Sequence, residues 1–346
     1  MSVVSVLGAL TREHVVGAGL LVATVLVARV VAIVARIYLQ PGASARQIAS
    51  YGRAGPDDKT PVYAVITGAS DGIGAAWARE LARRGYRVIL LARTESKLHA
   101  VAADCRAALT QQGLSDAANA AHPLAVVRPF DFSTRDDALW QALASDLAAY
   151  RIGVLINNVG VSTDMPTAFL EDKMSDLERI LDVNCLAQVR MTRIIAPGMA
   201  ARHAADARVR SVIVNMGSGS SESPIPLIAT YGASKAFLKA WSVSTSFELA
   251  PLGIDMQLYM TFFVQSAMSK ISRTSWNVPS PDTYVSYAIR RLGCGPFQTP
   301  YPAHALMHQL IYASLPTMLM GRLSHGVTAK LRESALRKQA RQNKSE

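Results

Sequence analysis

The longest apolar stretch of the chain lies close to its N-terminus. Residues 15–34 read VVGAGLLVATVLVARVVAIV, in which Arg29 is the only charged side chain. This run is long enough for a helix to cross the hydrocarbon core of a bilayer, which is about 30 Å thick. A cleaved secretory signal is one alternative, because residues 43–45 resemble a cleavage site, and a buried helix of a soluble domain is another. The length of the run and the charge of Arg29 favour a membrane anchor, which we place at residues 1–40.

Six shorter apolar runs follow, and helical patterns separate them. They are VYAVITG, YRVILLA, AVVRPFDF, GVLINNVG, SVIVNMGS and DMQLYM. Helical patterns cover about residues 73–84 and 95–109 and longer segments later in the chain, and residues 111–123 are predicted to form a loop. Strands that are apolar on both faces and alternate with helices are typical of a parallel sheet covered on both sides. The pattern therefore predicts an α/β fold, a Rossmann-type doubly wound parallel sheet, in a single domain over residues 61–321.

Three segments do not follow this alternation. Residues 41–60 are rich in Pro, Gly, Ser and charge and are predicted to link the anchor to the domain. Residues 300–321 are apolar but interrupted by Pro302 and Pro316. They are compatible with ordinary core, with a substrate tunnel or with a segment that rests on a membrane. Residues 322–346 form a basic tail that we expect to be a solvated helix with a frayed end, and contact with anionic lipid is an alternative.

Charge narrows the range of partners. The 346 residues carry a formal net charge of +11, so nucleic acid, anionic lipid headgroups and phosphorylated small molecules would all suit the surface. No zinc-finger spacing, aromatic–basic RNA motif or long lysine run occurs, and we predict no nucleic acid partner. Arg36, Arg46, Arg53 and Lys59 follow the apolar run. More positive charge follows the run than precedes it, which predicts that the main domain faces the cytosol.

The cysteines and histidines do not indicate a disulfide framework or a metal site. Cys105, Cys185 and Cys294 are widely spaced and no CxxC pair occurs, which fits a reducing compartment. His304 and His308 have the i,i+4 spacing of metal ligands, but no acidic residue or cysteine stands beside them in the sequence. We interpret both as packed or surface histidines and predict no bound metal.

A glycine-rich segment follows the first predicted strand. Residues 67–74 read TGASDGIG and open the first predicted helix of the domain. Gly68 would permit a tight turn, while Gly72 and Gly74 would let the backbone approach a pyrophosphate. The amide groups at the start of the helix would bind the phosphates. A turn without a ligand is the alternative, but the order strand, glycine loop, helix favours a dinucleotide site.

The second predicted strand indicates the form of the dinucleotide. An acidic residue that selects NAD is expected roughly 20 positions beyond the glycine loop, and Ala92 and Arg93 occupy this region. A missing carboxylate removes repulsion toward a 2′-phosphate, and Arg93 could pair with one. We therefore predict NADP(H) as the cofactor. Asp131, after the third strand, could accept a hydrogen bond from the adenine amino group.

A tyrosine and a lysine stand one helical turn apart in the segment TYGASK, residues 230–235. A phenol by itself ionises near pH ~10, far from neutral. A neighbouring ammonium favours the phenolate, so the spacing predicts that Lys235 lowers the pKa of Tyr231 toward the working range. By themselves, the two residues also fit an exposed aromatic–cation pair.

Taken together, these motifs resemble the short-chain dehydrogenase/reductase superfamily. The resemblance covers about residues 60–270 and includes TGxxxGIG, NNVG at residues 157–160, Ser218 thirteen positions before Tyr231, and YxxxK. It implies that Tyr231 protonates a substrate carbonyl oxygen, and that Lys235 lowers the pKa of the tyrosine and holds the nicotinamide ribose.

The resemblance implies roles for further residues. Ser218 would orient the same carbonyl oxygen, and Asn184 would support a proton-relay water beside the lysine. Asn157 and Gly160 would brace the sheet next to the cofactor. The implied cofactor site comprises Gly68, Ser70, Asp71, Gly72, Ile73, Gly74, Arg93, Asp131, Asn158, Tyr231, Lys235, Val264 and Ser266. Thr261 stands where the family usually has proline, which leaves the substrate range open.

A closer likeness spans nearly the whole chain. PGM at residues 197–199, PIPL at 224–227 and PYPAHAL at 300–306, together with the order anchor, linker, reductase, resemble the membrane-bound 17β-hydroxysteroid dehydrogenase and very-long-chain 3-oxoacyl-CoA reductase branch. This likeness implies NADPH-dependent reduction of the 3-oxo group of a long- or very-long-chain 3-oxoacyl-CoA in fatty-acid elongation. It also implies the endoplasmic reticulum membrane, with the catalytic domain facing the cytosol.

Other interpretations stay open. A hydroxysteroid dehydrogenase or another lipid-ketone reductase would use the same catalytic residues. A catalytically silent NADPH-binding protein is a third hypothesis, although intact Tyr231 and Lys235 argue against it. A homodimer and contacts with other fatty-acid elongation enzymes are left open as partners.

Overall fold

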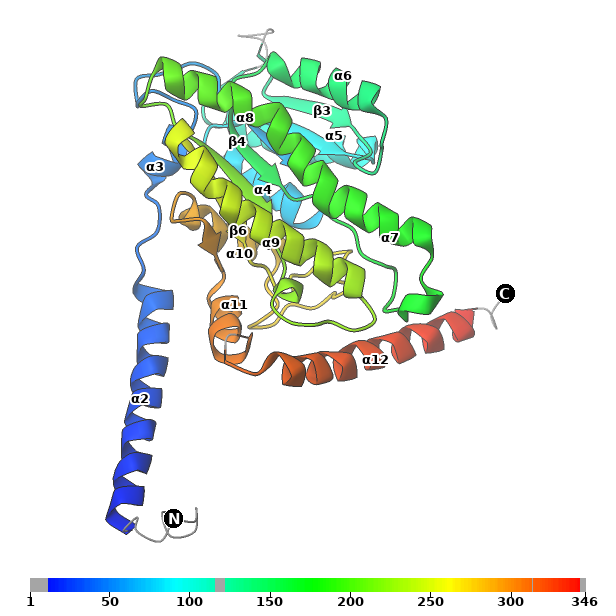
Figure 1. The fold of residues 1–346 in the computed structure, drawn as a ribbon. Coiled ribbons are helices and arrows are strands. Elements are labelled where there is room, and N and C mark those ends of the chain that lie inside the picture. The colour runs from blue at the N-terminus through cyan, green and yellow to red at the C-terminus, as the bar shows by residue number, and fades with distance from the viewer. Residues whose placement is uncertain (1–11, 116–121, 313, 343–346) are drawn as a thin grey trace.

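The computed structural model describes residues 12–115, 122–312 and 314–342. Parts of the predicted anchor, loop, apolar segment and tail lie outside the described residues, namely residues 1–11, 116–121, 313 and 343–346. Within the described part of the chain, seven strands form one parallel sheet (Figure 1).

The strands are β1 (Tyr63–Thr67), β2 (Arg87–Ala92), β3 (Ala125–Pro129), β4 (Ile152–Asn157), β5 (Ser211–Met216), β6 (Ile254–Tyr259) and β7 (Phe297–Gln298). Their order across the sheet is β3-β2-β1-β4-β5-β6-β7. The six predicted strands are confirmed. The two residues of β7 are too few to show a periodic pattern, so the sequence does not predict this edge strand.

Helices cover both faces of the sheet. On one face lie α4 (Gly72–Ala82), α5 (Glu95–Thr110) and α10 (Pro281–Ala288), and on the other lie α6 (Asp137–Ala148), α8 (Ala187–Ala205) and α9 (Ala229–Leu249). Side chains alternate along a strand, so Ala64 and Ile66 join the first core while Tyr63 and Val65 join the second. This arrangement confirms the Rossmann-type doubly wound fold.

Shorter elements complete the domain. They are η1 (Phe169–Glu171), α7 (Met174–Leu181), the π-helical turn η2 (Asp182–Leu186), η3 (Gly219–Ser221), η4 (Ala250–Leu252) and η5 (Ile289–Arg291).

The direction of the strand order reverses at β1. The chain runs outward from β1 through β2 to β3 and then returns to pair β4 with the other side of β1. The loops that leave β1 and β4 therefore diverge at the carboxyl ends of these strands, which is where open α/β sheets bind their ligands. Thr67 ends β1 and Asn157 ends β4, so the glycine-rich segment and the NNVG motif meet at this point.

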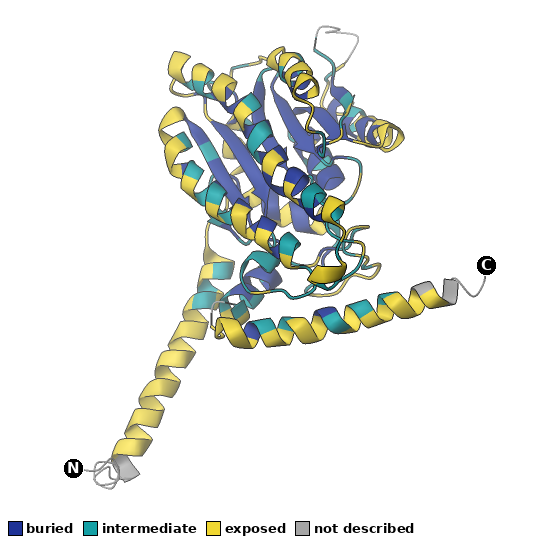
Figure 2. Cartoon of the chain, turned by 45° about the vertical axis from the view of Figure 1, so that its right-hand side comes forward, coloured by how far each residue is buried: buried dark blue, intermediate teal, exposed yellow. Residues whose placement is uncertain are grey.

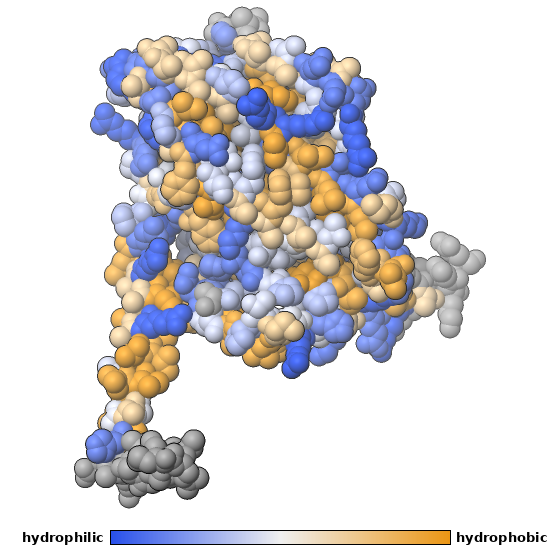
Figure 3. Space-filling model, viewed as in Figure 1, coloured by the Kyte–Doolittle hydropathy of each residue, from blue (hydrophilic) through white to orange (hydrophobic). Residues whose placement is uncertain are grey.

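The N-terminal apolar segment forms helix α2 (Arg12–Leu39), which extends away from the domain and is largely exposed (Figure 2). Residues His14–Leu39 have a mean hydropathy of 2.5, and the apolar stretch has no buried residues. Figure 3 shows a mostly hydrophobic surface along this helix. By length and composition α2 is a candidate membrane span, although a signal sequence meets the same criteria.

The segment predicted to be a linker, residues 41–60, is packed against the domain. It contains helix α3 (Ala45–Ser50). Ile48 and Tyr51 are almost fully buried, and the Tyr51 hydroxyl donates a hydrogen bond to Asp255 Oδ2 at 2.9 Å. The segment is therefore part of the folded unit, and its Pro- and Gly-rich composition reflects turns rather than free chain.

The C-terminal region continues as α11 (Pro302–Met307), the π-helical turn η6 (His308–Tyr312) and the long helix α12 (Thr317–Gln342). Figures 1 and 2 both show α12 along one end of the domain, crosswise to α2 and at the same end. The expected helical tail is present. However, its helix begins at Thr317, within the apolar segment 300–321, rather than at residue 322.

Candidate active site

Glycine is required where the chain turns from β1 into α4. Gly68 has a φ of +64°, a conformation that costs a side chain energy. A Cβ at Gly74 would lie 2.2 Å from the carbonyl oxygen of Gly68, so the turn folds directly onto the first helical residues. Asp71 caps α4 by accepting a hydrogen bond from Gly72 N at 2.7 Å. The remaining amide groups at the start of α4 are left for an anion.

Asn158 holds this turn from the neighbouring strand. Its Nδ2 donates to the carbonyl oxygens of Thr67 at 3.1 Å and Gly68 at 3.2 Å. In return, Thr67 Oγ1 accepts hydrogen bonds from the backbone N–H groups of Asn158 and Val159. The Asn158 side chain, expected to bind the cofactor, thus also fixes the glycine turn.

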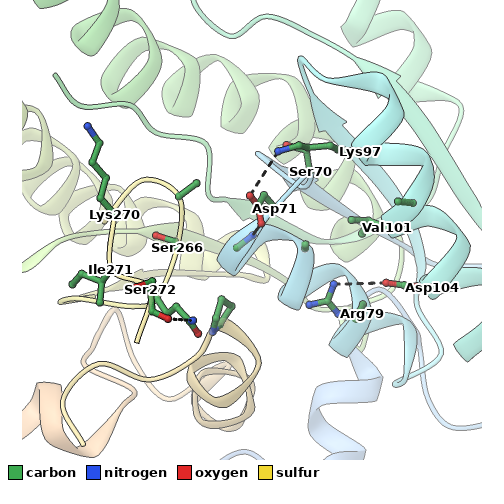
Figure 4. A pocket seen from close by; sticks show the side chains of 16 residues that line it. Ser70, Asp71, Arg79, Lys97, Val101, Asp104, Ser266, Lys270, Ile271 and Ser272 are labelled. Atoms are coloured by element: carbon green, nitrogen blue, oxygen red, sulfur yellow. Dashed lines mark hydrogen bonds and ion pairs between the residues drawn. The ribbon is translucent and has the colours of Figure 1, made fainter. Parts of the chain in front are cut away.

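A cavity of about 780 Å³ opens beside the glycine turn (Figure 4). Four of the expected cofactor residues line it: Ser70, Asp71, Gly72 and Ser266. Its volume is within the range of small-molecule and cofactor sites. The loop after β6, which carries Ser266, forms the side of the cavity opposite α4 and α5, as Figure 4 shows.

Positive side chains at this cavity were not expected. Lys97 on α5 lies 3.9 Å from Asp71 Oδ2, and Lys270 lines the cavity from the loop after β6. Lys97 lies in the first turn of the helix that follows Arg93, and its place in the sequence close to Arg93 could have revealed it. Lys270 is far from both in sequence and carries no such signal. The cations and the start of α4 together fit a phosphate-bearing dinucleotide.

Arg93 and Asp131 lie at the carboxyl ends of β2 and β3. Arg93 is exposed. Burial tends to raise the pKa of Asp131, but hydrogen bonds from Ser133 and the charge of Arg93 outweigh it, and the net pKa is lowered. The Ser133 hydroxyl donates to Asp131 Oδ1 at 2.8 Å. Arg93 is therefore close enough to Asp131 to act electrostatically and remains open to solvent.

Lys235 lies on the first turns of α9, buried beneath Tyr231. Its Nζ is 6.0 Å from the centre of the tyrosine ring and donates to the carbonyl oxygen of Met216 at 3.0 Å. Burial lowers the pKa of Lys235 to about 8, a shift that the charge of Cys185 opposes. The ammonium is thus held at the end of β5 and is still mostly protonated at neutral pH.

Burial raises the pKa of Tyr231, and hydrogen bonding to Ser218 and Ser220 only partly offsets this effect. This direction is opposite to the one predicted from the Tyr231–Lys235 spacing. The reason is that burial disfavours the charged phenolate, and Lys235, which donates to the Met216 carbonyl, does not offset this effect. The phenol therefore stays protonated at neutral pH.

Ser218 precedes η3 and shares hydrogen bonds with its neighbours. Its Oγ accepts from the backbone N–H of Ser220 at 3.2 Å and from Ser220 Oγ at 2.9 Å. Gly219 N donates to the carbonyl oxygen of Thr261 at 2.9 Å. The Thr261 hydroxyl lies 2.6 Å from the hydroxyl of Tyr284 on α10. We call residues 218–221 the serine loop. Thr261, at the position where the sequence resemblance implies proline, therefore links the serine loop to α10.

Asn184 lies in the π-helical turn η2, and its side chain is fully engaged. Its Nδ2 donates to the carbonyl oxygen of Val161 at 2.9 Å and to Ser234 Oγ at 3.0 Å, while its Oδ1 accepts from Val161 N at 2.8 Å. A Cβ at Gly160 would lie 3.4 Å from Asn184 Oδ1 and 3.5 Å from Lys235 Nζ. Asn184 thus positions the backbone beside Lys235. Both N–H groups of its amide are used in these bonds, and its Oδ1 keeps a second lone pair.

The sequence does not predict a partly buried ionic cluster next to the serine loop. Glu222 accepts hydrogen bonds from Lys239 at 2.6 Å and Ser221 at 3.0 Å, and its other oxygen lies 3.1 Å from His308 Nε2. Burial tends to raise the pKa of Glu222, but the hydrogen bonds of His308 and Lys239 lower it to about 2. His308 is 86 positions away in sequence, so spacing could not reveal the pair.

Both histidines of the apolar segment are buried. His304 lies between the carbonyl oxygens of Phe263 and Asn277, each 3.2 Å from its Nε2. His308 contacts Glu222, as described. Among the described residues, no group of three or more His, Cys, Asp or Glu side chains could hold a metal ion.

Comparisons with known proteins add to this geometry. A family model described as short chain dehydrogenase matches residues 62–276. A very-long-chain 3-oxoacyl-CoA reductase of Podospora anserina is 36% identical over 299 residues, which cover 83% of this chain and 82% of that protein. A protein of the same name from Meyerozyma guilliermondii is 38% identical over 292 residues, which cover 82% of each chain.

A solved structure shows the same fold with a dinucleotide. A short-chain dehydrogenase from Sphingobium yanoikuyae in complex with NADPH is 26% identical to this chain, with a TM-score of 0.56. The match covers 74% of this chain and 96% of that one.

Proposed function

Because the chain belongs to the short-chain dehydrogenase family, and is therefore an oxidoreductase, we propose that it reduces the 3-oxo group of a long- or very-long-chain 3-oxoacyl-CoA in fatty-acid elongation. The relatives with this activity in their names align over most of both chains. The likeness therefore includes segments outside the dinucleotide fold. The observation that carries the proposal is the convergence of Tyr231, Ser218 and Lys235 at the end of β5.

Tyr231 is the proton donor of the proposed reaction. Its phenol stays protonated, because removal from water raises its pKa, and Ser218 is close enough to the phenol to lower that pKa in part. The carbonyl oxygen of the substrate accepts hydrogen bonds from both hydroxyl groups, and Tyr231 gives up its proton as negative charge develops on that oxygen. The nearby ammonium of Lys235 stabilises the resulting phenolate.

Asn184 acts through the backbone in this scheme. By binding both the N–H and the carbonyl of Val161, it fixes the strand end that runs past Lys235. It is a positioning residue, because its side chain touches neither the phenol nor the cavity.

A nicotinamide cofactor, when bound, supplies the hydride that reaches the carbonyl carbon. Gly72 at the start of α4, with Ser70 and Ser266, would hold it in the cavity. NADPH is the proposed form, because Arg93 stands where NAD-binding sites place a carboxylate and Lys97 adds positive charge nearby.

We further propose that α2 anchors the protein in the endoplasmic reticulum membrane, with the catalytic domain on the cytosolic side. The exposed apolar surface of α2 supports the anchor, and the arginines and lysine that follow it support the orientation. A bilayer-bound enzyme suits a substrate whose acyl chain partitions into lipid.

The proposed reaction is tested with the full-length protein in detergent. NADPH consumption is measured with a long-chain 3-oxoacyl-CoA and, separately, with a 17-ketosteroid, and NADH replaces NADPH in a parallel series. We expect the acyl-CoA to turn over faster than the steroid, and NADPH to support a higher rate than NADH. Faster turnover of the steroid would replace the acyl-CoA assignment with the hydroxysteroid alternative. No turnover of either substrate would support a catalytically silent protein.

A further inference from the structure

The C-terminal end of α2 is fixed against the domain. Arg291 donates hydrogen bonds from its guanidinium to the carbonyl oxygens of Ile37, Gln40 and Pro41 at 3.3 to 3.5 Å. Closer to the N-terminus of α2, Arg29 Nη2 lies 3.5 Å from Ser314 Oγ. Arg291 thus joins the end of α2 to η5, and Arg29 joins α2 to the region between η6 and α12.

The contact at Arg29 sets the depth of that region relative to the apolar helix. Arg29 precedes Val34, the end of the apolar run, by five residues, which is about 8 Å along a helix axis. A bilayer that covers the run up to Val34 would therefore also reach Ser314. Interfacial helices bury their apolar face by about 5–10 Å, so the expected depth at Ser314 is that of the headgroup–acyl boundary.

Apolar side chains are exposed at this level. Between η6 and the start of α12, Leu310, Ile311, Leu315, Met318 and Leu319 all have more than a third of their surface accessible, and Met318 reaches 75%. Water-exposed apolar side chains that gather in one region mark an interaction surface.

The apolar surface continues along α12. Leu319, Leu323, Val327 and Leu331 recur every fourth residue, so they form one row on the helix. All four are exposed. The side of α12 that packs on the domain includes Thr328, which is 5% exposed. The row is therefore on the outward side of a helix that the domain already holds.

Positive charge accompanies this row. The helix carries six basic residues, namely Arg322, Lys330, Arg332, Arg337, Lys338 and Arg341, and one acidic residue, Glu333. Arg332 forms an ion pair with Glu171 and Arg337 forms one with Glu333, so these two contribute less to the attraction of anionic lipid than the other basic residues. Each basic residue close to an anionic membrane surface contributes about 1 kcal/mol to binding. A second copy of this chain would bring the same positive charge, so charge complementarity favours an anionic lipid surface over self-association.

We propose that a lipid-seated surface, formed by the exposed apolar side chains of Leu310, Ile311, Leu315 and Met318 and by the row Leu319, Leu323, Val327 and Leu331, lies in the headgroup region of an anionic bilayer. This inference rests on the proposal that α2 spans that bilayer. It adds a second contact with the membrane, which fixes how the domain is oriented on the surface rather than merely tethering it.

The surface lies near the candidate active site. Tyr312 of η6 contacts the ring of Phe262 with 5.1 Å between the ring centres. The Phe262 ring in turn packs against Gly219, where an added Cβ would lie 2.3 Å from it. Gly219 directly follows Ser218. Two aromatic side chains thus separate the lipid-seated surface from the serine loop.

The test uses the full-length chain with Cys294→Ser, because Cys105 and Cys185 are buried and would not react with a thiol probe. Single cysteines at Leu319 or Leu323 receive an environment-sensitive fluorophore, and the protein is placed in nanodiscs of phosphatidylcholine with phosphatidylserine. Val22→Cys on α2 reports the anchor, and Leu139→Cys on α6, exposed and apolar at the opposite end of the domain, is the matched control. Far-UV circular dichroism checks the fold of each variant.

Nitroxide-labelled lipid is the quencher. We expect the probes at residues 319 and 323 to be quenched at least about twofold more than the probe at residue 139, and to be shielded from a water-soluble quencher. Replacing phosphatidylserine by phosphatidylcholine should reduce the difference.

Three outcomes would overturn the inference. If the probe at residue 22 is quenched while those at 319 and 323 behave like the probe at 139, the anchor stands and the lipid-seated surface does not. If the probe at residue 22 is not quenched, both proposals fall. If shielding at 319 and 323 persists in detergent and grows with protein concentration, a second copy covers this surface. The acyl-CoA assay is independent of all three.

Discussion

A buried phenol keeps its proton to a higher pH than an exposed one, because removal from water penalises the charged phenolate. Tyr231 is in this situation: burial raises its pKa, and hydrogen bonding to Ser218 and Ser220 offsets only part of the effect. At neutral pH the residue therefore carries the proton that reduction of a carbonyl group consumes. The arrangement favours the reductive direction of the proposed reaction.

The proton-donor role predicts the effect of Tyr231→Phe, which removes the hydroxyl and keeps the ring. The rate of 3-oxoacyl-CoA reduction should fall by on the order of 10²-fold or more, the usual contribution of a positioned general acid. Steady-state NADPH consumption measures it. Tyr287→Phe, at an exposed tyrosine on α10, is the matched control and should leave the rate unchanged. Retained activity in Tyr231→Phe would remove the residue from its assigned role.

The exposed guanidinium of Arg93 predicts a change in cofactor preference. Arg93→Asp places a carboxylate where NAD-binding sites have one, so it should repel a 2′-phosphate and accept a hydrogen bond from a ribose hydroxyl. The ratio of kcat/KM for NADPH to that for NADH should fall by at least about tenfold, which is roughly 1.4 kcal/mol. Arg193→Asp makes the same charge change at an exposed position on α8 and should not alter the ratio. An unaltered ratio in Arg93→Asp as well would contradict the assignment.

At the scale of elements, the junction of β1 and α4 depends on the absence of a side chain at Gly74. In Gly74→Ala the new Cβ would meet the backbone oxygen of Gly68, which cannot move aside without opening the turn. We expect the free energy of unfolding to fall by about 1–3 kcal/mol and NADPH to bind more weakly. Thermal unfolding and cofactor titration measure the two effects. Gly55→Ala, with no atom within 4 Å of its Cβ, should change neither.

The Glu222 cluster joins η3, α9 and η6. Its carboxylate bonds to Ser221, whose hydroxyl also donates to the carbonyl oxygen of Ser218 at 2.8 Å. Lys239 and His308 hold it from the other two elements. The cluster thus positions the serine loop, although none of its members is among the proposed catalytic residues Ser218, Tyr231 and Lys235.

This cluster predicts a pH-dependent contribution to stability. The folded-state pKa of Glu222 is lowered from 4.5 to about 2, so the contribution is fully present above the unfolded value and is lost as the pH falls through the folded one. Glu222→Gln should lower the free energy of unfolding by about 2 kcal/mol at neutral pH, and the deficit should shrink between about pH 4.5 and pH 2. Denaturant unfolding at several pH values measures it, with Glu248→Gln on the exposed side of α9 as control. A deficit that does not change with pH would contradict the ionic explanation.

At the scale of the whole molecule, the apolar helix α2 and the basic residues that follow it predict which side of the membrane carries the catalytic domain. Protease added to sealed microsomes should digest an epitope placed after Glu346, because the proposed orientation puts this end on the cytosolic side. A lumenal marker protein should remain intact in the same sample. Protection of the epitope until detergent is added would place the domain in the lumen and contradict the proposed orientation.

The sequence by itself determined the sheet, the dinucleotide loop and the catalytic tyrosine and lysine as candidates. Each of these is encoded locally: apolar runs specify buried parallel strands, glycines specify a turn that side chains would block, and YxxxK specifies one face of a helix. Local patterns can be read because the residues that act together are neighbours along the chain.

Only the tertiary structure decided features that join distant segments. The packing of residues 41–60, the Glu222–His308 contact and the tie between Thr261 and Tyr284 all depend on which elements meet. The direction of the Tyr231 pKa belongs here too, because burial raises it and the hydrogen bonds of Ser218 and Ser220 offset only part of this effect. Desolvation and long-range contacts arise only when the chain has folded, and no spacing within one element encodes them.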